Sequence, residues 1–252
     1  MSPPRANPPE QEEHGPPGPP AGPEAGEVGA GGTYRLDRAE LRRDWPAWLA
    51  LAAGLVAAAL AYPHLPEAVP IHFDIQGRPD RYAGRLVGAF GLPLLNVAAY
   101  GLMLLGPLVD PGRSNYPRFA GFYRGLRVMM AWVLAAMEAV VLSVGLGRPV
   151  DVGLVTLAAV SLLLLYTGNS LGRVRFNYFV GIRTPWTLAS ERVWRRTHRV
   201  GGRLLVAAAL LPWAGMLFSR AAAFWLLVAG VGVATVGSMV YSLVLYRREV
   251  SA

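Results

Sequence analysis

Three ionisable side chains gather in one polar connector of this sequence, His72, Asp74 and Asp80. Together with His64 they offer imidazole and carboxylate groups, which divalent metals take as ligands in proteins. No helical or strand framework is expected to fix their spacing, and no metal-site signature accompanies them. We therefore predict no metal site and interpret the connector as a compact turn that presents a ligand-contact surface. The residues of that surface are His72, Phe73, Asp74, Gly77, Asp80 and Tyr82.

A single carboxylic acid, Glu138, stands near the middle of a long apolar run. A charged group at that depth in a membrane is costly, so it should face the interior of a helix bundle and have a partner. One interpretation is a proton or ion relay, or a counter-charge for a ligand. The other is a structural hydrogen bond to Asn96, Ser143, Thr156 or a backbone carbonyl. We favour the structural interpretation, because a transporter usually carries more buried polar groups than this chain offers.

Residues 166–202 form a polar stretch between apolar runs, studded with Gly, Arg, Asn and aromatic side chains. It lacks a nucleophile–base pair, because Ser190 and His198 lie eight positions apart on one expected helix. A Thr-Pro pair begins that helix, and from Trp186 to Thr197 one face is aromatic and apolar beside arginines. This pattern predicts an interfacial amphipathic helix that contacts anionic lipid or a cytoplasmic partner. The contact residues are Asn169, Gly172, Arg175, Asn177, Gly181, Arg183, Thr184, Pro185, Trp186, Trp194 and His198.

The composition points to a membrane protein. The chain is 53% hydrophobic and only 16% charged, whereas soluble domains carry about 25% charged residues. It has no cysteine and no lysine, which excludes disulfides, thiol nucleophiles, cysteine-ligated metals and Schiff-base lysines. We also expect no catalytic residue and no cofactor, and a protein that is not an enzyme.

Six apolar runs approach the length of about 20 residues that spans a bilayer. They are Trp45–Tyr62, Leu86–Val109, Val128–Leu146, Val150–Leu171, Leu204–Ser219 and Ala221–Tyr246. The sequence thus predicts an all-α polytopic membrane protein with six transmembrane helices, and with the amphipathic helix on the cytoplasmic side between the fourth and fifth.

Arginine is distributed unevenly between the two sides that six spans create. Nineteen of the 24 arginines fall on the side of the termini and of connector 172–203. The positive-inside rule then places both termini in the cytoplasm and connector 63–85 outside. Because this basic charge is topogenic, we expect no direct contact with nucleic acid. We divide the chain into a disordered Pro/Gly-rich tail (1–33), a two-span region (34–110) and a four-span region (111–252).

A family pattern runs through the polar stretch. Its matching residues are Gly168, Asn169, Leu171, Gly172, Arg175, Asn177, Gly181 to Leu188, Ser190, Val193, Trp194, Thr197, His198, Gly201 and Gly202. This pattern resembles the SdpI family of integral membrane immunity and signalling proteins. The outer connector is similar to the domain of unknown function that commonly precedes the SdpI region, through Pro70, His72, Phe73, Gly77, Pro79, Asp80 and Tyr82.

The resemblance implies a multi-pass protein of the bacterial cytoplasmic membrane that protects its cell from a secreted peptide toxin. It also implies a signalling role in which a cytoplasmic transcriptional repressor is recruited to the membrane, whose lipids are further partners. Two other interpretations stay open. One is a small transporter or ion pathway that uses Glu138, and the other is a membrane enzyme that uses His72, Asp74 and Asp80.

Overall fold

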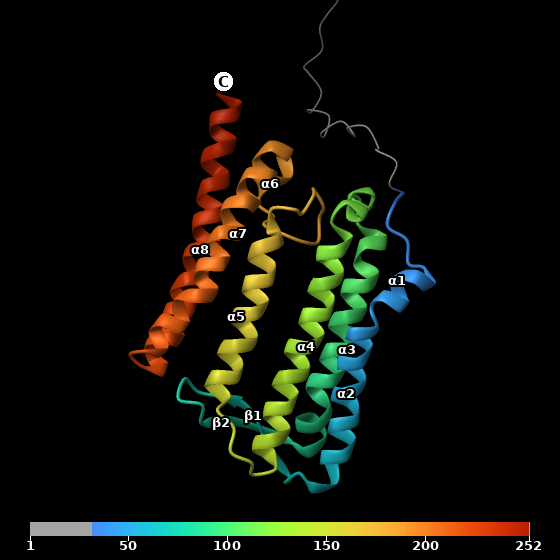
Figure 1. Ribbon diagram of the computed structural model, residues 1–252, viewed down its shortest axis with the longest axis vertical. Helices are drawn as coiled ribbons and strands as arrows, with labels where there is room; N and C mark the ends of the chain where they lie inside the picture. The colour runs from blue at the N-terminus through green and yellow to red at the C-terminus, as the bar shows by residue number, and fades with distance from the viewer. Residues whose placement is uncertain (1–31, 252) are drawn as a thin grey trace, which may run out of the picture.

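The computed structural model describes residues 32–251 and is mostly helical (Figure 1). The predicted disordered tail therefore lies outside the described residues, except for its last two positions. Six long helices carry the fold: α2 (Trp45–Ala61), α3 (Arg85–Val109), α4 (Ala120–Gly145), α5 (Val152–Leu171), α7 (Glu191–Met216) and α8 (Arg220–Val250). Their order follows the six predicted apolar runs, but α4 begins eight residues and α7 thirteen residues before the predicted run.

Short elements join the long helices. They are α1 (Arg38–Arg43), the 3₁₀ helices η1 (Tyr62–His64) and η2 (Arg113–Phe119), and α6 (Pro185–Ala189). Side-chain caps set several helix starts, because the first amides of a helix lack backbone partners. Asp151 accepts from the amide of Leu154 at 3.1 Å, and Ser219 accepts from that of Ala222 at 3.0 Å.

Five helices are long and apolar enough to cross a membrane: α2, α3, α4 with η2, α5 and α8. These helices support a multi-pass membrane protein. Helix α7 is of sufficient length, but its N-terminal half carries Arg192, Arg195, Arg196, Arg199 and Arg203. The sixth span, in the C-terminal half of α7, stays a prediction.

The long helices pack as two groups joined by α4 and α5. Helix α4 contacts both α2 and α3, and α7 contacts both α5 and α8. A Cβ on Gly168 of α5 would lie 2.7 Å from the carbonyl oxygen of Gly202 of α7, so these two helices touch backbone to backbone. The packing thus groups α4 with α2 and α3, whereas the predicted division between residues 110 and 111 separates them.

The connector predicted as a turn contains a β-hairpin, so the all-α prediction missed two strands. Strand β1 (Ala68–Phe73) pairs antiparallel with β2 (Pro79–Gly84). The hairpin is anchored by Val69, which is fully buried and packs in one apolar cluster with Leu65 and Ala89. Pro70 and Pro79 made these strands hard to predict from the sequence, because proline is rare in sheet interiors and is tolerated only where its missing N–H is not needed.

The predicted single amphipathic helix is two helices in the structure. Ser190 adopts an extended conformation (φ −143°, ψ 123°), ends α6 and caps α7. Helix α7 then continues without interruption into the predicted fifth span. The face that carries Val193, Trp194 and Thr197 is buried against the rest of the protein. The periodicity therefore identified a buried face correctly, but the protein itself covers this face, where we expected lipid or a cytoplasmic partner.

Candidate functional site

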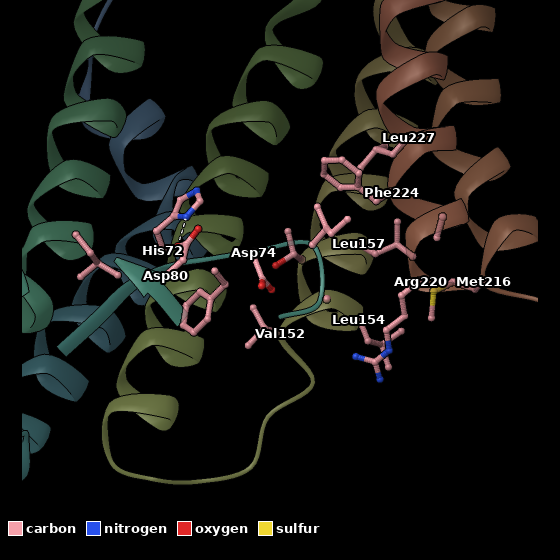
Figure 2. A pocket seen from close by; sticks show the side chains of 16 residues that line it. His72, Asp74, Asp80, Val152, Leu154, Leu157, Met216, Arg220, Phe224 and Leu227 are labelled. Carbon is pink, nitrogen blue, oxygen red and sulfur yellow. Dashed lines mark hydrogen bonds and ion pairs between the residues drawn. The ribbon is translucent and has the colours of Figure 1, made fainter. Parts of the chain in front are cut away.

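A cavity of about 630 Å³ lies beside the hairpin, and we refer to it as the hairpin pocket (Figure 2). The hairpin forms one wall, the N-terminal end of α5 another, and the junction of α7 and α8 the third. Its apolar lining includes Ile71, Phe73, Ile75, Val152, Leu154, Leu157, Met216, Ala223, Phe224 and Leu227. In Figure 1 the strands β1 and β2, which form one wall of this pocket, lie at the end of the bundle opposite the C-terminus.

The polar groups of the pocket are a contact between His72 and Asp80, an ion pair between Arg220 and Asp151, and a turn. The Nδ1 of His72 lies 2.6 Å from Oδ1 of Asp80, across the hairpin. Arg220 donates to both carboxylate oxygens of Asp151, at 2.9 and 2.6 Å. Asp74 accepts from two amides of its own turn, at 2.9 and 2.8 Å. The pocket therefore combines an apolar interior with charged groups at its edge.

The structure brings together four of the six residues predicted for the outer surface. His72, Phe73, Asp74 and Asp80 line the hairpin pocket. Gly77 lies in the hairpin turn, and Tyr82 is 58% exposed and does not line the pocket. In residues 32–251, no group of three or more His, Asp or Glu side chains is placed to hold a metal ion.

At the opposite end, the loop between α5 and α6 is fastened internally by Asn177, which is fully buried. Its Nδ2 donates to the carbonyl oxygens of Arg175 and Val180, at 2.8 and 3.0 Å. Its Oδ1 accepts from the amides of Phe179 and Val180, at 2.9 and 2.6 Å. Asn177 thereby satisfies four backbone groups that no helix or strand would satisfy. We assigned Asn177 to partner contact, but in the structure its side chain is buried and bonds only to its own loop.

His198 ties the same loop to α7. Its Nε2 accepts from the amide of Ile182 at 3.0 Å, and its Nδ1 lies 2.8 Å from the carbonyl oxygen of Trp194. Because an amide only donates and a carbonyl only accepts, both contacts require the neutral ring with its proton on Nδ1. Burial lowers the pKa of His198 to about 4, which agrees with a neutral ring. We call His198, Ile182 and Trp194 the His198 latch.

The other predicted loop residues surround this latch. Thr184 caps α6 and lies 3.0 Å from the hydroxyl of Ser242 on α8, while Arg183 donates to the carbonyl oxygen of Tyr178 at 2.6 Å. Trp194 donates from its indole nitrogen to the carbonyl oxygen of Val174 at 2.9 Å. Asn169, Gly172, Arg175, Pro185 and Trp186 are exposed or partly exposed. These five keep surface available for lipid or a partner.

Glu138 is buried in the middle of α4 without the partner that we expected. Both carboxylate oxygens lack a hydrogen bond to any described residue. Asn96 donates to the carbonyl oxygen of Ala131 at 2.9 Å, and Thr156 contacts the sulfur of Met137 at 3.8 Å. Neither side chain is therefore bound to Glu138, and the structural hydrogen bond predicted from the sequence is absent from residues 32–251.

One buried ionic cluster was not predicted. Arg127 of α4 donates to both carboxylate oxygens of Asp44, at 3.0 and 3.1 Å, and to Glu40 at 2.7 Å. Tyr100 donates its hydroxyl to Asp44 at 2.8 Å. The only sign of this cluster in the sequence is that Asp44 and Arg127 each stand directly before an apolar run. We counted Arg127 simply as topogenic charge.

Comparisons with known proteins agree with these elements. The model of the SdpI/YfhL protein family matches residues 173–242, and the model of a domain of unknown function, DUF1648, matches residues 49–97. The chain is 24% identical over 156 residues to "Immunity protein SdpI" of Bacillus subtilis (strain 168), covering 62% of this chain and 72% of that protein. It is 38% identical over 50 residues to "Uncharacterized membrane protein YbgB" of the same organism, covering 20% and 55%. No solved structure matches the chain.

Each of the two matched regions contains long helices together with a connector at one end of the bundle. The first contains Asn177, the His198 latch, α7 and most of α8, while the second contains α2, the hairpin and the start of α3. This multi-pass bacterial membrane protein thus resembles the SdpI/YfhL family over residues 173–242 and DUF1648 over residues 49–97.

Proposed function

We propose that this protein gives its cell immunity to a secreted peptide toxin and that the hairpin pocket is the site that engages the toxin. The hairpin pocket carries the proposal, because it is a cavity of about 630 Å³ formed by parts of both family regions. The name of the related Bacillus subtilis protein supports the activity.

The chemistry of the pocket suits an amphipathic peptide. Ile71, Leu154 and Phe224 offer apolar surface, and each is more than a third exposed. The His72–Asp80 pair and Asp74 supply polar groups at the edge that can bind a peptide backbone or a basic side chain. The hairpin has only two strands, so each strand has an outer edge with backbone groups to which an extended peptide can add.

The opposite end would carry the signal to the cell interior. Arg192, Arg196 and Arg248 surround a surface hollow of about 260 Å³ between α7 and α8. With both termini in the cytoplasm, these arginines face the cytoplasmic side, where they can recruit an acidic surface of a transcriptional repressor. Membrane lipids cover the apolar outer faces of the helices.

The immunity proposal is tested by survival of a toxin-sensitive bacterium that expresses the protein. We expect wild-type protein to protect against the peptide encoded in the same operon. Leu154→Trp should abolish protection, because it fills the pocket, whereas Leu162→Trp should preserve it. Both leucines are exposed on α5, but only Leu154 lines the pocket. Equal protection by the two variants would place the toxin elsewhere, and no protection by wild-type protein would refute immunity.

The orientation of the helices in the membrane is tested with single introduced cysteines. Because the chain has no cysteine of its own, any label identifies the introduced position. An impermeant maleimide should label Gln76→Cys and Leu217→Cys on intact cells. It should label Ser251→Cys only after lysis. Labelling of Ser251→Cys from outside would mean that α7 does not cross the membrane.

A further inference from the structure

Within the described helices α2, α3, α4 and α5, Glu138 is the only carboxylic acid, and its side chain is buried, with 1% of the residue exposed. Both of its oxygens lack a hydrogen-bond partner within residues 32–251. An ionised carboxylate buried without a partner costs far more than a neutral carboxylic acid. The carboxyl group therefore carries its proton in this structure.

The groups that face Glu138 supply no compensating cation. Helix α2 has no titratable side chain, and the candidates on the surrounding elements are Arg85 and Tyr100 on α3, Tyr166 on α5, His72 on β1, and Tyr123, Arg124 and Arg127 on α4. None of them donates to Glu138. Arg127 is held by Asp44 and Glu40, and His72 by Asp80. The proton is thus the only counter-charge that these described residues allow.

Polar groups lie on one side of Glu138 along α4. Arg127, Ala131 and Glu138 share a helix face, and eleven residues separate the first from the last, which is about 16 Å. The carbonyl oxygen of Ala131 accepts from Asn96, whose own Oδ1 is buried without a partner. Side chains on a helix tilt toward its N-terminus. The carboxyl of Glu138 therefore points toward the Asn96 and Arg127 end.

The other side of Glu138 is closed by apolar packing. Val141 and Leu142 belong to a buried cluster with Ala58, Leu65 and Val69. A Cβ on Gly145, farther along α4, would lie 2.8 Å from the Leu65 side chain. Apolar side chains thus fill the space between Glu138 and the hairpin end, which offers a proton no polar path along this face of α4.

Open space lies beside Gly54 of α2, and the packing of α2 against α4 places this glycine near the level of Glu138. Helices α2 and α4 run parallel, because Asp44 contacts Arg127 near one end and Ala58 packs with Val141 near the other. This register places Gly54 level with Glu138. Gly54 is buried, yet no atom lies within 4 Å of the position that its Cβ would occupy.

We propose that Glu138 is a membrane-embedded proton-binding site, whose neutral carboxyl exchanges its proton with the α1 end of the bundle only. A site that is open on one side binds a proton without carrying it across. The proposal is independent of toxin immunity, and it differs from an ion pathway because the hairpin side is closed.

Carbodiimide labelling of the full-length protein in membranes tests the neutral carboxyl. A protonated carboxyl adds to dicyclohexylcarbodiimide, its proton moves to nitrogen, and the resulting O-acylisourea rearranges to a stable N-acylurea that mass spectrometry locates. We expect an adduct at Glu138 at neutral pH. Gly54→Val should slow the labelling several-fold by filling the space, whereas Gly101→Val should not, since its Cβ also meets nothing within 4 Å but lies on α3. Absence of the adduct from wild-type protein, or equal rates in the two variants, would overturn the proposal.

Infrared spectroscopy tests the route of exchange. The carbonyl band of a neutral carboxylic acid should disappear in Glu138→Gln and shift in deuterated buffer in the wild type. Asn96→Leu should slow that shift several-fold. The matched variant Asn169→Leu, at an exposed position on α5, should leave it unchanged. Equal exchange in Asn96→Leu and Asn169→Leu would refute access from the α1 end.

Discussion

The Nε2 atom of His198 accepts a hydrogen bond from the amide of Ile182 at 3.0 Å, although sixteen positions separate the two residues. The ring also stacks on Trp194, with 4.1 Å between the ring centroids. One imidazole thus fixes the loop that precedes α6 onto the first turns of α7. It can do so only while Nε2 is unprotonated.

The His198 latch predicts a stability that depends on pH. Burial lowers the pKa of His198 from 6.5 to about 4, so the unfolded chain binds a proton that the folded protein excludes. Stability is complete above pH 6.5, decreases as the pH falls from 6.5 to 4, and loses on the order of 3 kcal/mol over this window. Thermal unfolding of the purified protein in micelles, at stepped pH, measures the loss.

His198→Phe is the control for that measurement, because it retains a ring beside Trp194 and removes the titrating group. We expect the variant to be less stable at neutral pH and to show a flatter pH dependence below 6.5. An unchanged pH dependence would assign the effect to other residues.

Gly181 predicts a second stability effect at the latch. Its φ of +113° is unfavourable for residues with a Cβ, and a Cβ there would overlap Nε2 of His198. Gly181→Ala should therefore destabilise the protein by about 2 kcal/mol or more and expose Trp194 to quenchers. Gly232→Ala, in a helix interior where a Cβ meets no neighbour within 4 Å, should be neutral or slightly stabilising. Similar effects of the two substitutions would contradict this explanation.

The buried cluster of Arg127, Asp44 and Glu40 predicts strong coupling. Arg127→Met leaves the buried Asp44 without a cation and leaves Glu40 with Arg124 alone, at 3.8 Å, and breaking a buried pair in this way costs about 3–5 kcal/mol. The double variant Arg127→Met with Asp44→Asn should cost clearly less than the sum of the two single changes. Denaturant titration of all four proteins gives the coupling energy, and strict additivity would show that the pair does not interact.

An exposed ion pair provides the comparison for this cluster. Glu191 and Arg195 lie 3.7 Å apart on α7, and about half of each side chain is exposed. Glu191→Gln should change stability by less than about 1 kcal/mol, because solvent screens the pair. A loss as large as that of Arg127→Met would mean that burial does not set the strength of these pairs.

The close contact between α5 and α7 predicts that no side chain larger than that of glycine fits at Gly168. A Cβ there would lie 2.7 Å from the carbonyl oxygen of Gly202 and 2.9 Å from the amide nitrogen of Val206, and backbone cannot yield as side chains do. Gly168→Val should destabilise by about 1–3 kcal/mol or prevent folding. Gly121→Val, where a Cβ meets no neighbour, should preserve yield and melting temperature.

Helix positions could be predicted from the sequence, because hydrophobic length and flanking turn residues are local properties. Tyr62 with Pro63, and Asp110 with Pro111, marked the ends of α2 and α3 within a residue or two. The break at Ser190 was less visible. A serine can cap a new helix or continue an old one, and its hydroxyl contacts with Glu249 depend on the position of α8.

Contacts between distant residues could not be predicted. The His72–Asp80 pair depends on the hairpin, the Arg127–Asp44 pair on the packing of α4 against α2, and the His198–Ile182 bond on a loop conformation. Each joins elements whose relative position no local pattern records. For the same reason the sequence assigned Asn177 and His198 to partner contact, whereas their hydrogen bonds are internal.

Helix α7 belongs to two sites at once. Its N-terminal half carries His198, whose ring holds Ile182, and it ends at Met216 in the wall of the hairpin pocket, eighteen positions or about 27 Å farther along at 1.5 Å per residue. Displacement of one end of a continuous helix displaces the other end as well. A ligand that displaced Met216 would therefore also move the N-terminal half of α7 and strain the hydrogen bond between His198 and Ile182. A displacement at one end of α7 would then reach the other end through the helix itself, without a diffusing ligand.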